Sequence, residues 1–234
     1  LRNSPGRPND LNPAHVFLVF AGYMLLGGLS IFGLESLNIE KSRAQLLGSM
    51  IAQSGLIVLA LPVAEYTFTH GLVRGMGLSL RHWGFDTLRG LGACLAILPV
   101  CWGLLAATAW ILVTINLDIF EKHSLLVTIH NVPPLWKLGV IVSAVVLAPL
   151  AEELLFRGLL QSMLRRYLQS PWPAILVTSA LFGLVHSSTP QNIPALVALG
   201  VALGYNYERT GRLIPCLVTH AAFNGVMILS ELIA

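Results

Sequence analysis

Long runs without any charged residue recur along the chain, and they restrict the possible folds more than any other feature. Residues 91–117 contain no Asp, Glu, Lys or Arg, and residues 139–151 contain none either. Only 11% of the chain is charged and its mean hydropathy is +0.74, whereas about a quarter of an average soluble domain is charged. Because a helix needs about 20 predominantly apolar residues to cross a bilayer, the sequence predicts an all-α, polytopic bundle of transmembrane helices.

Turn and charge signals divide this bundle into about seven to eight spans. Residues 1–12 are polar and rich in proline, so we expect a flexible lead-in followed by a single transmembrane domain at residues 13–234. Residues 66–90 combine arginines, aromatic residues and glycines, a mixture typical of the membrane interface. The fourth span is longer than a bilayer requires, so it must tilt, extend beyond the bilayer or break near Pro149. The predicted spans are residues 13–34, 44–64, 91–117, 136–168, 172–186, 191–207 and 213–234, with a polar stretch at residues 118–134.

The basic residues are divided unequally between the two sides of the predicted bundle. The formal net charge is only +3, which indicates membrane topology rather than binding to nucleic acid. If the N-terminus and residues 66–90, 157–170 and 208–212 lie on one side, most of the 14 basic residues lie there. The positive-inside rule then predicts a cytoplasmic N-terminus. The basic residues on that side are Arg2, Arg7, Arg74, Arg81, Arg89, Arg157, Arg165, Arg166, Arg209 and Arg212, and those on the other side are Lys41, Arg43, Lys122 and Lys137.

Glu152, Glu153 and Arg157 are charged residues inside an otherwise apolar run. Charged side chains are costly within a membrane, and they commonly mark functional sites there. Glu153 and Arg157 are four residues apart, so they share a helix face in the order that favours an ion pair. Adjacent residues are about 100° apart around a helix, so Glu152 points elsewhere. We expect Glu153 to pair with Arg157 and Glu152 to face a cavity as the freer candidate base.

Two histidines and an asparagine lie at a depth similar to that of Glu153. At about 1.5 Å of rise per residue, Glu153 and His186 both lie about 25 Å from the turn near Ser170. His220 and Asn224 are four residues apart, so they share a helix face. They lie about 14 and 20 Å from the next turn on the same side. Helix geometry therefore allows these side chains to meet, while the sequence does not fix how far apart they lie laterally.

Two kinds of hydrolytic site fit these residue types. In the first, a carboxylate in a low-dielectric cavity takes a proton from water with help from a histidine, and His220 and Asn224 stabilise an oxyanion. In the second, Glu153, His186 and His220 bind a catalytic zinc ion that keeps an open position for water. The same groups also have a structural interpretation, as a buried ion pair, an interfacial histidine and interhelical hydrogen bonds. Their common depth favours the functional interpretation.

Three short motifs resemble those of a known family: Glu152-Glu153-x-x-x-Arg157, Phe182-x-x-x-His186 and His220-x-x-x-Asn224. They look like the motifs of the CPBP intramembrane proteases, also called the CAAX protease and bacteriocin-processing or Abi family, over about residues 140–229. The resemblance implies an intramembrane endopeptidase that cleaves a peptide bond in or near the bilayer. It implies that Glu152 activates the water with help from His186, that His220 and Asn224 are oxyanion or metal-side groups, and that Glu153 and Arg157 support them.

The resemblance leaves the cofactor and the substrate open. Members of the family are described as metal-dependent, and a metal-free glutamate mechanism has also been argued for one branch, so zinc is an alternative here. The expected partners are membrane lipid and a peptide or membrane-protein substrate, in a bacterial inner membrane or an organellar membrane. One rival hypothesis is a non-catalytic membrane scaffold or immunity-type protein of the same fold. Another is a transporter with a Glu and His proton relay, although no inverted repeat is detectable.

Overall fold

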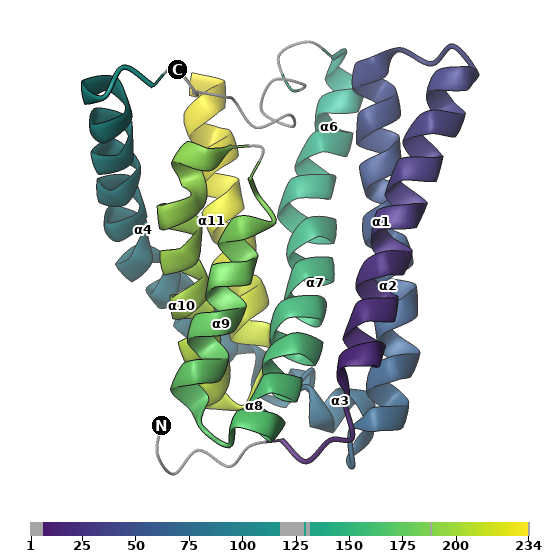
Figure 1. Cartoon of the computed structure of the whole chain (residues 1–234), viewed down its shortest axis with the longest axis vertical. Helices are drawn as coiled ribbons and strands as arrows, with labels where there is room; N and C mark the ends of the chain where they lie inside the picture. Colours follow the sequence, from purple (N-terminus) through teal and green to yellow (C-terminus); the bar gives the residue numbers. More distant parts are fainter. Residues whose placement is uncertain (1–6, 118–128, 130–131, 188, 234) are drawn as a thin grey trace.

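The computed structural model describes residues 7–117, 129, 132–187 and 189–233, and these form a bundle of helices (Figure 1). Within these ranges there is no β-strand, only an isolated bridge between Asn9 and Phe68. Five helices in the described part are long and apolar enough to cross a membrane. The prediction of an all-α, polytopic transmembrane bundle is therefore confirmed.

The helices follow the predicted spans, with differences at their ends. α4 begins at Trp83, earlier than the predicted start at residue 91, and Asp86 in its first turn interacts favourably with the helix dipole. The polar stretch predicted at residues 118–134 lies largely outside the described residues, as do Arg2 and Lys122. The elements apart from the central helix are α1 (Pro13–Ser36), α2 (Lys41–Thr67), α3 (Gly71–Gly75), η1 (Leu80–His82), α4 (Trp83–Thr114), α9 (Pro171–Leu184), η4 (Pro190–Asn192), α10 (Ile193–Thr210) and α11 (Ile214–Ile233).

One continuous helix runs from Pro134 to Leu168 through the centre of the bundle. Of the three alternatives for this long span, a break near Pro149 does not occur. The N–H of Ala148 bonds the carbonyl of Ser143, five residues back, so the turn before the proline is wider than an α-helical turn and accommodates its ring. This central helix consists of α6 (Pro134–Val142), the π-helical segment η2 (Ser143–Leu147), α7 (Ala148–Glu153), the π-helical segment η3 (Leu154–Gln161) and α8 (Ser162–Leu168).

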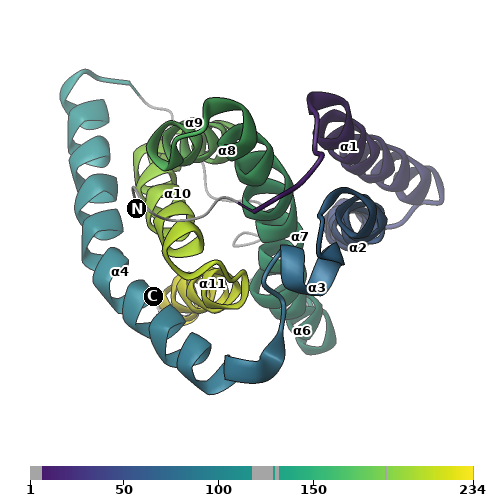
Figure 2. The same cartoon turned by 90° about the horizontal axis from the view of Figure 1, so that it is seen from below.

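The central helix lies between two groups of helices (Figures 1 and 2). α1 and α2 pack as a hairpin on one side, and α9, α10 and α11 lie on the other, with α4 against the outer side of α10 and α11 (Figure 2). Small residues let such helices approach closely in membranes. A Cβ atom added to Gly200 of α10, for example, would lie 2.9 Å from the Cβ atom of Ser179 of α9. This close packing places α9, α10 and α11 around the polar residues of α7 and η3.

Arginine contacts hold one end of the bundle together. Arg212, in the turn between α10 and α11, pairs with Asp86 of α4 at 2.6 Å, and Asp86 is buried. Arg7 lies over the ring of Tyr207, 3.5 Å from its centroid, and donates a hydrogen bond to its backbone carbonyl. Residues 7–12 of the predicted lead-in therefore run along this end of the bundle. That this end faces the cytoplasm stays a prediction.

Candidate active site

The buried charges of the central helix form a connected network with α11. Arg157 Nη1 lies 2.9 Å from Glu153 Oε1, and both side chains are completely buried. The same carboxylate oxygen lies 2.8 Å from Nδ1 of His220. Arg157 also donates through Nη2 to the backbone carbonyl of Gly200 at 3.2 Å. The ion pair predicted between Glu153 and Arg157 is therefore present, and it also connects the central helix to α10 and α11.

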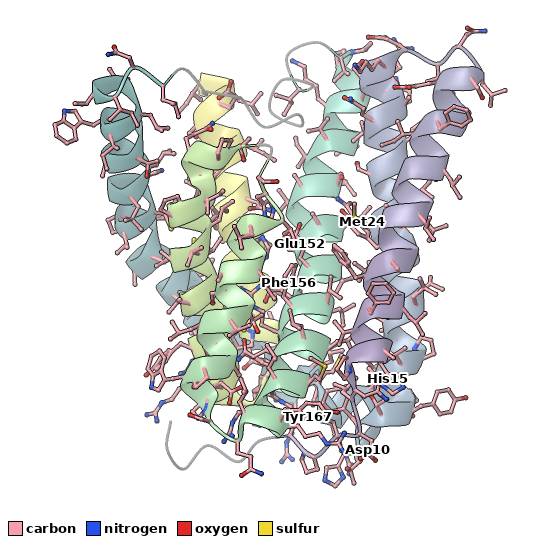
Figure 3. The ribbon with its side chains drawn as sticks, in the orientation of Figure 1. Asp10, His15, Met24, Glu152, Phe156 and Tyr167 are labelled. Carbon is pink, nitrogen blue, oxygen red and sulfur yellow. The ribbon has the colours of Figure 1, made fainter. Side chains whose placement is uncertain are left out.

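Glu152 has a different environment from its neighbour. Its side chain is 27% exposed, whereas that of Glu153 is 0% exposed. Glu152 Oε2 lies 3.7 Å from Nε2 of His220. Figure 3 shows Glu152 near the middle of the bundle, at a level close to that of Met24 in α1, and far from the end marked by Asp10. The partly exposed carboxylate is thus accessible at mid-height, as expected for the freer of the two glutamates.

The contacts of Glu153 determine which nitrogen of His220 is available. Glu153 already accepts from Arg157 as a carboxylate, so the hydrogen bond at 2.8 Å requires a proton on Nδ1 of His220. In a neutral imidazole the other nitrogen, Nε2, then has the lone pair. This nitrogen is the one that faces Glu152. Glu152 and His220 therefore present two hydrogen-bond acceptors 3.7 Å apart, and a water molecule beside the pair can donate to both.

His186 reaches the same region from the end of α9. It lies in the turn after the last helical residue, Leu184, and its Nδ1 is 2.8 Å from the carbonyl of Phe182. The ring of Phe182 contacts both histidines, with centroids 5.2 Å from His186 and 5.6 Å from His220. The Arg157 guanidinium lies over the same ring at 4.7 Å. The two histidines, which were predicted to lie at a similar depth, therefore both contact one buried phenylalanine.

Asn224 satisfies a carbonyl group that Pro149 leaves without its helical partner. In the π-helical turn each N–H bonds the carbonyl five residues back, as Ala148 bonds Ser143. Pro149 has no N–H to give to the equivalent carbonyl, that of Ala144. Asn224 Nδ2 donates to this carbonyl at 2.8 Å. One amide hydrogen of Asn224 is thus used structurally, and the other remains for a second acceptor.

This contact predicts a specific pair of substitutions. We expect Asn224→Ala to lower the free energy of unfolding by about 1–3 kcal/mol, because a partly buried carbonyl loses its donor. Adding Pro149→Ala supplies a backbone N–H and should recover most of that loss. Thermal unfolding in detergent measures both effects, with Ser230→Ala on the exposed end of α11 as the control. Equal destabilisation with and without Pro149→Ala would contradict this account.

The three side chains predicted as zinc ligands do not form a metal site in this structure. Among the described residues no group of three His, Cys, Asp or Glu side chains lies close enough to hold a metal ion. Glu153 Oε1 is shared by Arg157 and His220, and Nδ1 of His186 is bonded to a backbone carbonyl. Glu153 Oε2 is buried without a partner in the described part of the chain, but one oxygen is not a ligand set. We therefore derive no step through a metal.

Two contributors to the site were missed from the sequence. Tyr23 of α1 lies near enough to Glu152 for the two to interact electrostatically. Its position as a lone phenol inside an apolar run was the available signal. Gly200 contributes its backbone carbonyl to Arg157, and no residue type could have signalled that contact. The site is therefore built from α1, the central helix, the end of α9, α10 and α11.

A protein-family model matches part of the chain, within its C-terminal half. Residues 134–226 match the model of a family described as Rce1-like, type II CAAX prenyl endopeptidase Rce1-like. The match contains all three motifs and confirms the resemblance to the CPBP family. Comparison with curated proteins and with solved structures gave no match.

Proposed function

We propose, from the place of residues 134–226 in this CAAX-type intramembrane protease family, that the chain hydrolyses a peptide bond in or near the bilayer with a water molecule activated by Glu152. The observation that carries the proposal is the contrast between two adjacent carboxylates. Glu153 is buried in an ion pair, while Glu152 is partly exposed beside Nε2 of His220. A carboxylate that is accessible to water and that pairs, among the described residues, only with a histidine is suited to act as a base.

In the proposed reaction Glu152 takes one proton from the water as its oxygen attacks the carbonyl carbon of the substrate. The water lies beside the pair formed by Glu152 Oε2 and His220 Nε2, which are 3.7 Å apart, and donates one hydrogen bond to each. The C–N bond then breaks, and the proton on Glu152 passes to the leaving amine. The products are a carboxylic acid and an amine, and the acid then gives its proton to the amine to leave a carboxylate and an ammonium group, so atoms and protons balance. Glu153 holds the proton of His220 on Nδ1 and thereby fixes the orientation of Nε2.

The oxyanion needs hydrogen-bond donors close to the same point. We assign this role to the second amide hydrogen of Asn224, and we assign His186 to assisting Glu152. His220, with its proton on Nδ1, is assigned to positioning the water rather than to donating to the oxyanion. This differs from the role that the family resemblance implies for His220, and it follows from the contact with Glu153.

The substrate class can be tested directly. The matched family is named for CAAX prenyl endopeptidases, so a peptide with a C-terminal CAAX sequence, farnesylated or unmodified, is the first probe. The protein is reconstituted in liposomes, the peptide is added in ¹⁸O-labelled water, and the products are analysed by mass spectrometry. Hydrolysis incorporates one ¹⁸O atom into the new carboxylate. Proton-coupled uptake without cleavage of either peptide would instead support a transporter.

Removal of metal ions distinguishes the two hydrolytic mechanisms. We expect a chelator such as 1,10-phenanthroline to leave cleavage unchanged, because the described residues do not gather a set of metal ligands. The measurement is the initial rate before and after chelation, followed by dialysis to remove the chelator. A zinc protease treated in parallel shows that the chelator is effective. Loss of activity that returns only when zinc is added back would overturn the metal-free mechanism.

A further inference from the structure

A groove lies between α4 and α10, on the outside of the bundle and separate from the candidate active site. It has a volume of about 420 Å³. Most of its lining is apolar, and three of the lining residues are alanines, which leave space between the two helices. The apolar lining residues are Ala93, Ala96, Ile97, Ala202 and Tyr205. A groove of this shape on a membrane-facing surface suits a hydrocarbon chain.

One end of the groove is polar and positively charged. Arg89 and Asn206 line it, and Arg89 Nε donates to Asn206 Oδ1 at 3.0 Å. Asn206 is only 5% exposed, yet its Nδ2 has no hydrogen-bond partner in the described part of the chain. Arg89 has no carboxylate within ion-pair distance among the same residues. A buried amide donor without an acceptor is costly, so this end of the groove is complementary to an anion that accepts hydrogen bonds.

Aromatic side chains place this polar end at the membrane interface. Trp172 and Tyr205 stack with ring centroids 6.1 Å apart, and both are exposed. Trp83 and Phe85, at the start of α4, are also exposed. Tryptophan and tyrosine concentrate at the level of lipid headgroups. The polar end of the groove therefore lies where headgroups lie, and its apolar part extends toward the bilayer interior.

We propose that this groove binds one anionic phospholipid of the surrounding bilayer. An acyl chain lies along the alanine-lined part, and the phosphate accepts hydrogen bonds from the Arg89 guanidinium, which Asn206 Oδ1 holds in place. The positive charge discriminates against zwitterionic lipids, whose cationic headgroup lies beside the same phosphate. None of these residues belongs to the proposed catalytic machinery, so lipid binding and peptide cleavage are separable properties.

Native mass spectrometry tests this proposal on the purified full-length chain. The protein is delipidated in a non-ionic detergent and titrated with phosphatidylglycerol or with phosphatidylcholine of the same acyl chains. We expect one tightly retained phosphatidylglycerol and weaker binding of phosphatidylcholine. Arg89→Gln should weaken phosphatidylglycerol binding about fivefold or more, because it removes the cation that lines the groove and contacts the phosphate. Arg74→Gln, which removes an exposed arginine at the same end, should not change it.

A second pair of variants tests the apolar part of the groove. Ala96 and Ala106 are both exposed on α4, but only Ala96 lines the groove. Ala96→Trp should block retention of the lipid, whereas Ala106→Trp should leave it intact, and thermal unfolding verifies that both variants fold. Equal retention of the two lipids, or equal effects of Arg89→Gln and Arg74→Gln, would overturn the proposal. A dimer without bound lipid that Ala96→Trp dissociates would identify a second copy of the chain as the occupant instead.

Discussion

Glu152→Gln is expected to reduce peptide cleavage by about 10²–10⁴-fold, the range typical for loss of a general base. Glutamine keeps the size of the side chain and one acceptor oxygen, but it cannot take a proton from water. Because Glu152 is 27% exposed and lies 3.7 Å from Nε2 of His220 without a direct hydrogen bond to it, stability should change little. The initial rate of cleavage and the unfolding temperature, measured on the same preparation in liposomes and in detergent, separate the two effects.

A matched control removes a carboxylate of the same type from an exposed position. Glu35, near the end of α1, is exposed, and Glu35→Gln should leave both cleavage and stability unchanged. If Glu152→Gln cleaves as fast as Glu35→Gln, Glu152 is not the base. If the biological effect of the chain persists in Glu152→Gln while cleavage is lost, the chain acts as a non-catalytic scaffold, which was one of the rival hypotheses from the sequence.

Contacts within one helix were predictable because helix geometry fixes them locally. The spacing of Glu153 and Arg157 places their side chains on one face, and the structure contains their ion pair. The same geometry separated Glu152 from Glu153 and predicted their different environments. The rise per residue also placed His186 and His220 at a common depth, and both contact the ring of Phe182. These inferences used helix geometry within one element, or the distance of a residue from the turn at the end of its helix, with the basic residues placing the two turns on the same side.

Contacts between helices were not predictable, because an apolar helix in a membrane shows no hydrophobic face that identifies its neighbour. The sequence did not indicate that Asn224 donates to the carbonyl of Ala144, since that contact depends on a π-helical turn before Pro149. From the sequence we also predicted that the fifth helix extends to His186, whereas α9 ends at Leu184. At that end His186 Nδ1 bonds the carbonyl of Phe182, which has no partner within the helix.

Arg157→Met is expected to lower the free energy of unfolding by about 3–5 kcal/mol, because it leaves Glu153 as an uncompensated charge in a dry environment. Both side chains are 0% exposed, so water cannot solvate the remaining carboxylate. Thermal or denaturant unfolding in detergent measures the loss. The control is Arg43→Met, since Arg43 forms an exposed pair with Glu40 at 3.2 Å, and exposed pairs contribute about 0–1 kcal/mol. Equal effects of the two variants would show that Arg157 is not in a dry site.

The double variant Glu153→Gln/Arg157→Met separates stability from positioning. Replacing both members of a buried ion pair is often neutral or stabilising, because the cost of desolvating two charges disappears. We therefore expect the double variant to recover the stability that Arg157→Met loses, yet to cleave slowly, because a neutral amide holds His220 less firmly than a carboxylate does. Recovery of both stability and cleavage would mean that the ion pair only packs the helices. Recovery of stability alone would mean that the chain keeps two buried charges in order to orient His220 toward Glu152.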